Sequence, residues 1–184
     1  MLDHFRFGLM LIFSPRSGWE AINETPYSPG TLALYTLVLA FPLFIFRSLG
    51  TLLDGVSFPW FALEGLLFTL ICLGASLTLG LLLIPCARFA RRPVNDGHAM
   101  KLALFSSTPV WLFSFAQLLP VGLVRTTVLL LSLGHGCVLL FLGLPTLYGT
   151  EPVFTLMLSL VASALWVLGL ALFTQVFLGM AFSF

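Results

Sequence analysis

The chain has 184 residues, of which 59% are hydrophobic and 8% are charged, whereas about a quarter of the residues in soluble domains are charged. Because so apolar a chain cannot cover its own surface with polar groups, the composition excludes a soluble domain and indicates that the lipid bilayer is the solvent. The formal net charge of +1 gives no basic field that would attract nucleic acid, which is therefore excluded as a partner.

Residues 1–26 differ from the rest of the chain because they mix charged and apolar side chains. The serine–proline pair at residues 14–15 is typical of an N-cap and a first helical position, and it predicts a short helix that carries Trp19. We expect this cytoplasmic or interfacial leader to lie along the membrane surface, with Trp19 at headgroup level and Arg6 and Arg16 facing lipid phosphates. The alternative is a leader that is simply a tether.

Residues 27–184 contain five long neutral runs separated by charges. A membrane-spanning helix needs about 20 predominantly apolar residues, and continuous apolar runs of that length indicate helices rather than barrel strands. The predicted fold is therefore all-α: a polytopic membrane protein with a bundle of about five transmembrane helices and a short N-terminal interfacial helix. The spans are expected at residues 29–49, 61–86, 101–119, 122–146 and 153–177.

Three prolines fall inside the predicted spans or near their ends, and they are expected to kink the helices. They are Pro42, Pro109 and Pro145. The hydroxyl groups of residues 106–108 precede Pro109 and are expected to satisfy the carbonyl groups that this proline leaves without a donor.

The orientation follows from lysine and arginine, which are enriched in short cytoplasmic connections. Six of these eight residues lie in the leader or in residues 88–101, and two spans separate these segments, so both lie on one side. Only Arg47 and Arg125 lie on the other side, near span ends. We therefore expect a cytoplasmic N-terminus and, after five spans, a C-terminus on the outer face.

Polar side chains in the outer half of the predicted bundle form a possible intramembrane polar site, made of Arg47, Glu64, Gln117, Arg125 and Gln175. Charge inside a membrane is costly unless it is paired, so we expect Glu64 to pair with Arg47 or Arg125. One interpretation is an ion pair that serves only the structure. The other is a polar vestibule for an ion or a solute.

His135 lies near the middle of the fourth predicted span. An intramembrane histidine can relay protons, because imidazole titrates near neutral pH. The alternative is a structural hydrogen bond to a neighbouring helix, for which Ser76 and Thr78 are the candidate partners.

The basic cluster Arg88, Arg91 and Arg92 follows the second predicted span. Such a cluster can contact anionic lipid headgroups, and it can also simply fix the topology. Both roles are compatible with the same residues.

Small residues four positions apart occur in two of the predicted spans, as Ser76 with Gly80 and Ser132 with Gly136. Such pairs let helix backbones approach closely. The pattern fits packing inside the bundle and fits a dimer face equally well.

Motifs that would indicate catalysis or cofactor binding are not found in the sequence. It contains no glycine-rich dinucleotide loop, P-loop, zinc-protease motif or nucleophile elbow. Its three cysteines, Cys72, Cys86 and Cys137, have no metal-site spacing. We therefore expect neither an enzyme, nor a metal site, nor a cofactor.

Residues 14–22 contain the pattern Pro-x-x-x-Trp-x-x-Ile, which is similar to the opening of bacterial members of the Ypt-interacting protein (Yip) family. The resemblance continues at residues 40–42 (Ala-Phe-Pro), in residues 103–109 (Ala-Leu-Phe-Ser-Ser-Thr-Pro) and at residues 142–145 (Leu-Gly-Leu-Pro). It implies five spans and a cytoplasmic N-terminus. Eukaryotic relatives are associated with prenylated Rab-type GTPases, but their longer acidic-aromatic cytoplasmic domain is absent here. The chain therefore resembles the short bacterial inner-membrane type.

Two functional hypotheses remain after these exclusions. The first is a non-enzymatic membrane scaffold or adaptor that contacts membrane lipids and either a membrane-protein partner or a second copy of itself. The second is a small channel or transporter subunit that uses the outer polar residues and His135 along its path.

Overall fold

The computed structural model of the protein describes residues 2–89, 96–120 and 122–181, with side chains described for residues 6–85, 97–120, 122–169 and 171. Over these residues the structure consists of helices and contains no strand, which confirms the all-α prediction. The elements are α1 (Leu2–Phe13), α2 (Pro15–Glu24), α3 (Pro29–Leu53), α4 (Trp60–Phe89), α5 (Asp96–Ser106), α6 (Thr108–Leu112), the 3-10 helix η1 (Phe113–Leu118), α7 (Leu123–Tyr148) and α8 (Pro152–Ala181).

Five helical segments within the described residues are long and apolar enough to cross a membrane, so the chain is a multi-pass membrane protein. Four of them are the long helices α3, α4, α7 and α8, and the other combines α5, α6 and η1. The predicted spans are found in order, and the helices extend a few residues beyond several of the predicted ends.

The ends of α3 and α7 show why these helices start and stop where they do. Ser28 caps α3 by accepting a hydrogen bond from the backbone N–H of Thr31 (3.4 Å), and Pro29 occupies the first turn. Gly149 follows α7 in the left-handed conformation (φ 59°), and its N–H donates to the carbonyl of Pro145 (2.8 Å). Both ends therefore satisfy backbone groups that would otherwise be unpaired.

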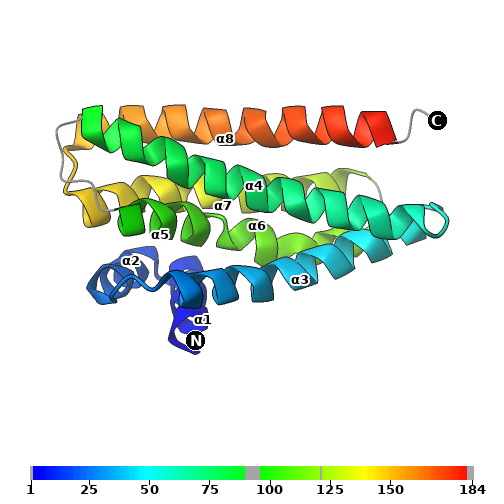
Figure 1. Ribbon diagram of the computed structural model, residues 1–184, viewed down its shortest axis with the longest axis horizontal. Coiled ribbons are helices and arrows are strands. Elements are labelled where there is room, and N and C mark those ends of the chain that lie inside the picture. The colour runs from blue at the N-terminus through cyan, green and yellow to red at the C-terminus, as the bar shows by residue number, and fades with distance from the viewer. Residues whose placement is uncertain (1, 90–95, 121, 182–184) are drawn as a thin grey trace.

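The bundle has two ends, which Figure 1 separates along its long axis. The leader end carries α1 and α2, the start of α3, the end of α4 and the start of α5. The far end carries the α3–α4 connection and the end of α8 (Figure 1). The leader and the residues that flank the α4–α5 connection therefore share one end, as predicted.

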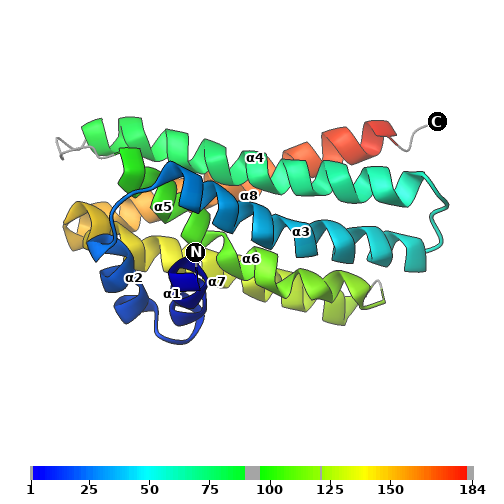
Figure 2. The same ribbon diagram turned by 60° about the horizontal axis from the view of Figure 1, so that its bottom comes forward.

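The third span is broken and lies in the middle of the bundle. It packs among α3, α4 and α7 (Figures 1 and 2), and 72% of its most apolar stretch is buried, against 28–39% for the other four spans. The break falls where Thr108 and Pro109 begin a new short helix after α5. The span is therefore broken at Pro109, where a kink was predicted, whereas α3 and α7 continue as single helices through Pro42 and Pro145.

Hydroxyl groups at this break join three spans. The hydroxyl of Thr108 is 2.7 Å from that of Tyr35 on α3, and the hydroxyl of Ser107 is 2.8 Å from that of Ser76 on α4. Ser107 also donates to the carbonyl of Ala103 (2.8 Å). These buried polar groups satisfy one another in surroundings where unpaired groups are costly.

Both small-residue pairs lie inside the bundle and pack against the broken span. A Cβ atom on Gly80 would come within 2.9 Å of the sulfur of Met100, and one on Gly136 within 2.7 Å of the carbonyl oxygen of Ser106. Ser76 and Ser132 are buried as well. The alternative left open by the sequence is thus resolved in favour of internal packing, because these residues are not on a free surface.

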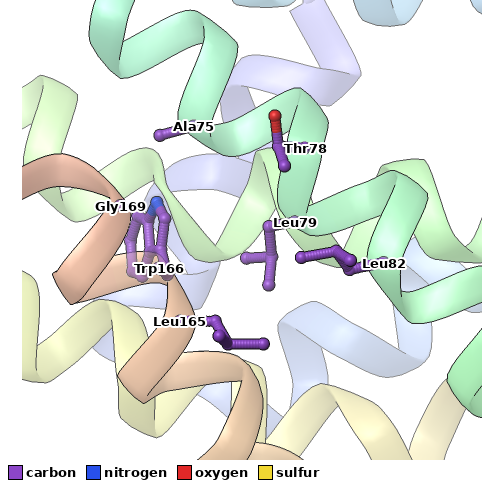
Figure 3. Close-up of a pocket in the computed structure, with 7 residues that line it drawn as sticks. All are labelled: Ala75, Thr78, Leu79, Leu82, Leu165, Trp166 and Gly169. Atoms are coloured by element: carbon purple, nitrogen blue, oxygen red, sulfur yellow. The ribbon is translucent and has the colours of Figure 1, made fainter. Parts of the chain in front are cut away.

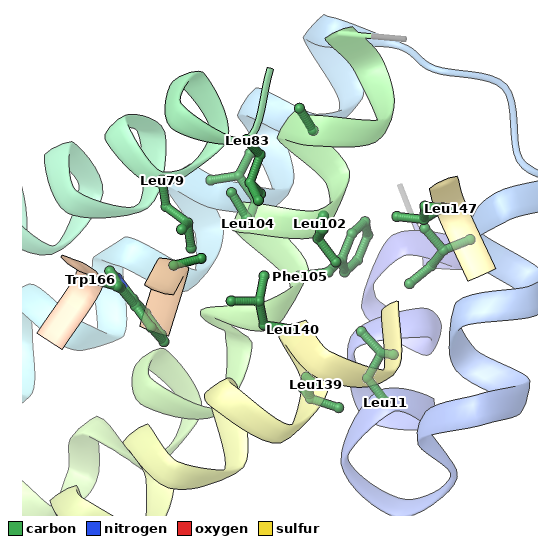
Figure 4. Packing of buried hydrophobic residues seen from close by; sticks show 14 of the residues in the cluster. Leu11, Leu79, Leu83, Leu102, Leu104, Phe105, Leu139, Leu140, Leu147 and Trp166 are labelled. Carbon is green, nitrogen blue, oxygen red and sulfur yellow. The ribbon is translucent and has the colours of Figure 1, made fainter. Parts of the chain in front are cut away.

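The leader belongs to the hydrophobic core. Leu11 on α1 and Trp19 and Ile22 on α2 join the buried cluster that contains Leu139 and Leu140 of α7. Figure 4 shows Leu11 in the same region as these two leucines. The helix over Trp19 is confirmed, but the expected position of this side chain is wrong: Trp19 is 0% exposed and does not reach the headgroups. An amphipathic helix with one tryptophan can present it to the core as readily as to an interface.

Candidate functional site

Five polar side chains at the far end form one hydrogen-bonded chain that we call the polar network: Glu64, Arg47, Gln117, Arg125 and Asp54. Arg47 pairs with Glu64 and donates to the Oε1 atom of Gln117 (2.9 Å). Arg125 donates to the same Oε1 atom (2.8 Å) and to the Oδ2 atom of Asp54 (2.8 Å). The network links α3, α4, η1 and α7.

Helix geometry explains why these residues meet. Arg47 and Asp54 are seven residues apart, which places them on the same face of α3 two turns apart. Gly50 lies between them, and a Cβ atom there would be 2.1 Å from the carbonyl oxygen of Gln117. The absence of a side chain at position 50 therefore lets η1 approach α3 closely enough for Gln117 to reach both arginines.

The charges of the polar network cancel. It holds two arginines and two carboxylates, and the side chains of Glu64 and Arg125 are only 9% and 8% exposed. Arg47 also lies over the ring of Phe68, with its Cζ atom 4.9 Å from the ring centroid. Buried charges are tolerated when they are paired and hydrogen-bonded. The arrangement holds four elements together at the far end.

The sequence predicted part of this network. The pairing of Glu64 with Arg47 is confirmed, and Gln117 and Arg125 lie where they were expected. Arg125, however, pairs with Asp54, which the sequence analysis did not single out. Asp54 follows the last residue of α3, where a carboxylate is usually solvated, so nothing local marked it as a partner.

His135 does not belong to the polar network. It follows Arg125 by ten residues on α7, about 15 Å along the helix axis. Its Nε2 atom is buried and has no hydrogen-bond partner in the described part of the chain. The two partners considered for it are wrong: Ser76 bonds Cys72 and Ser107 instead, and Thr78 is exposed.

The other predicted site residues are distributed as follows. Arg6 and Arg16 are exposed on the leader, as a contact with headgroups requires. The side chains of Gln175 and of the basic cluster Arg88, Arg91 and Arg92 lie outside the described residues.

Lys101 is a buried residue that holds the leader in place. It is only 4% exposed, and its Nζ atom donates to the carbonyl oxygens of Ile22 (2.9 Å) and Thr25 (2.5 Å). A cation at this position suits the C-terminus of α2, where carbonyl groups are unpaired and the helix dipole is negative. The sequence marked Lys101 only as one of the charges that set the topology, because its partners are backbone carbonyls.

Trp19 makes a second contact between the leader and the bundle. Its Nε1 atom donates to the carbonyl of Leu139 on α7 (3.0 Å). Gly143 provides the space one turn later, since a Cβ atom there would be 2.6 Å from the Cε2 atom of Trp19 and 2.5 Å from Leu102. Two contacts therefore hold the leader on the bundle. The ring of Trp19 occupies the space left by Gly143, a notch on α7, and Lys101 bonds the last carbonyl groups of α2.

The described part of the chain also contains a small cavity and an open groove. A cavity of about 40 Å³ lies between α4 and α8, with Leu79 and Leu82 on one side and Leu165 and Trp166 on the other (Figure 3). A groove of about 410 Å³ lies between α3, α4 and α5, and its lining is almost entirely apolar. Neither brings titratable groups together, and the described residues contain no group of three side chains that could hold a metal.

Comparison of the chain with models of protein families, with curated proteins and with solved structures returned no match.

Proposed function

We propose that the protein is a non-enzymatic scaffold or adaptor of the bacterial inner membrane, of the short type that resembles the Yip family. In this proposal the leader end faces the cytoplasm and the C-terminus faces the periplasm. The protein acts through lateral contacts with membrane proteins and lipids. The exposed Arg6 and Arg16 and the basic cluster Arg88, Arg91 and Arg92 contact anionic headgroups.

One observation carries this proposal: the polar network and Lys101 hold the helices of the bundle together, while its outer surface is apolar. The polar network is neutral and bridges four elements, and Lys101 is engaged by the leader. By contrast, Phe41, Leu131 and Leu160 on three different helices are 62–68% exposed. A rigid frame with an apolar exterior suits lateral recognition within the membrane.

Site-specific photocrosslinking in native membranes tests the scaffold proposal. A photoreactive residue replaces Phe41, Leu131 or Leu160, one at a time, and the matched control replaces Leu140, which is 0% exposed. We expect at least one exposed position to give a protein adduct of defined mass that the control does not give. If all three exposed positions yield only lipid adducts, the protein has no lateral protein partner and the proposal fails.

A channel or transporter subunit is the second candidate, and it is favoured by the buried Nε2 atom of His135, which has no hydrogen-bond partner among the described residues. A buried imidazole nitrogen without a partner is available to a proton or a passing ligand. Flux measurements in liposomes that contain the purified protein test this candidate. Transport through these residues requires that His135→Ala and Glu64→Gln lower the flux, so unchanged flux in both variants rejects it.

A further inference from the structure

Helix α1 has one face packed on the bundle and an opposite face that is exposed. Gly8 and Leu11, three positions apart, are buried. Arg6, Leu9 and Phe13 lie at positions i, i+3 and i+7, which share one side of a helix. Leu9 is 50% exposed and Phe13 is 82% exposed. The exposed face of α1 is therefore apolar, with a single arginine at its N-terminal end among the residues whose side chains the structure describes.

The contacts of Gly8 place α1 beside the interior of two membrane spans. A Cβ atom on Gly8 would be 2.5 Å from the hydroxyl oxygen of Tyr35 and 3.4 Å from the Cγ2 atom of Thr108. Tyr35 lies six residues after Pro29, where the first span begins, and Thr108 lies eleven residues after Gly97, where the third span begins. At 1.5 Å per residue these two positions are about 9 Å and 16 Å inside their spans. Helix α1 thus lies beside the spans rather than beyond their ends.

The direction of α1 agrees with this placement. The long helices follow the long axis of the bundle, whereas α1 crosses that axis (Figure 1). In both views α1 lies nearer the middle of the bundle than α2 does (Figures 1 and 2). Because the spans follow the membrane normal, a helix that crosses them lies in the plane of the membrane. The face of α1 opposite the bundle therefore points sideways, away from the spans.

Depth and charge together identify what this face contacts. A lateral surface beside the interior of the spans meets the acyl chains of the leaflet, and Leu9 and Phe13 match them in polarity. Arg6 on the same face and Arg16 at the start of α2 are exposed. Their long side chains can reach from this depth to the headgroups, whose phosphates complement their charge.

We propose that α1 is an in-plane anchor whose exposed Leu9 and Phe13 insert among the acyl chains of the leaflet on the leader side. This inference rests on the lipid contacts of the proposed function and deepens them. The proposed function has the leader touch headgroups through its arginines, whereas here one helix of the leader lies within the apolar layer. The lipid that surrounds the bundle is then a third support of the leader, beside the contacts of Trp19 and Lys101.

Spin labelling of the full-length protein tests the anchor. A nitroxide is attached to Leu9→Cys or Phe13→Cys in a cysteine-free chain, which is reconstituted into phosphatidylethanolamine–phosphatidylglycerol vesicles. Collisions of the nitroxide with oxygen, which concentrates among acyl chains, are compared with collisions with a water-soluble nickel chelate. Leu34, which is 44% exposed on α3 beside Tyr35, provides the acyl-chain reference. Ser17, an exposed residue of α2, is the control on the same leader.

We expect the nitroxides at Leu9 and Phe13 to collide more often with oxygen than with the nickel chelate, as at Leu34. The order should be reversed at Ser17. Both replaced side chains are on the exposed face, so the packed face that contains Gly8 and Leu11 is unchanged and the leader stays docked. Two labelled positions one turn apart also guard against a local effect of either label.

Two results overturn the inference. One is access of the nickel chelate to both positions of α1 at the level of Ser17, which places this face in water. The other is dipolar broadening of the spectrum at Phe13 that disappears when labelled protein is diluted with unlabelled protein, which makes a second copy the neighbour. The crosslinks from Phe41, Leu131 and Leu160 are scored separately. A chain without a protein adduct there and with oxygen access at Phe13 loses the scaffold proposal but keeps the anchor, and the opposite pair of results does the reverse.

Discussion

Replacing Trp19 by alanine should release the leader from the bundle without unfolding the membrane spans. The side chain is 0% exposed and donates a hydrogen bond of 3.0 Å to Leu139. Truncating a fully buried tryptophan to alanine costs about 3–5 kcal/mol. Because the affected contacts join α2 to α7, this cost falls on docking of the leader, and the polar network at the far end is untouched.

Hydrogen exchange measured by mass spectrometry on the purified protein gives the readout. A loss of 3–5 kcal/mol raises the exchange rate of amides that open with the leader by roughly a hundredfold to a few thousandfold. Peptides from α2 should show this increase, whereas α3 and α7 keep their protection. Trp60→Ala is the control, since Trp60 is 48% exposed. Unchanged exchange in α2, or an equal loss of protection in α7, would refute the reasoning.

Three further changes test the other contacts. Lys101→Met removes the donor from the last carbonyls of α2 and should speed exchange at the end of that helix roughly tenfold; slower exchange would mean that burying the cation costs more than its hydrogen bonds return. Gln117→Leu removes the acceptor shared by the two arginines and should lower the free energy of unfolding in mixed micelles by about 3 kcal/mol, whereas an equally stable variant would show that the arginines need only their carboxylates. Thiol labelling of intact cells, with a cysteine placed at Asp96 or Phe184 of a cysteine-free chain, should label only Phe184→Cys from outside; labelling of Asp96→Cys would reverse the proposed orientation.

The number and order of the spans were predictable because they depend on hydropathy summed over whole segments and on the length of those segments. Charges interrupt the apolar runs at intervals that match the thickness of a bilayer, so the five spans and their order follow from hydropathy and length. The pair of Arg47 and Glu64 was predictable for a related reason. Two opposite charges at the same depth on consecutive spans have few other partners within the membrane.

The contacts that sequence analysis missed depend on tertiary geometry. Trp19 is equally suited to an interface and to a core, and only the notch at Gly143 on α7 decides between them. Lys101 looked like a loop cation because its partners are backbone carbonyls, which every residue carries and which leave no mark in the sequence. Asp54 reaches Arg125 across 71 positions of the chain. No local pattern in the sequence predicts a contact between residues so far apart in the chain.

The broken third span has a consequence for biogenesis. It has the lowest mean hydropathy of the five spans, and it is enclosed by helices that come both before and after it in the chain. As it leaves the ribosome it has little affinity for acyl chains, and α7, one of the helices that enclose it, has not yet been made. We therefore expect it to enter the bilayer together with α7 as a helical pair. A chain truncated after residue 122 should leave this segment uninserted in a translocation assay, and insertion of the truncated segment by itself would argue against paired entry.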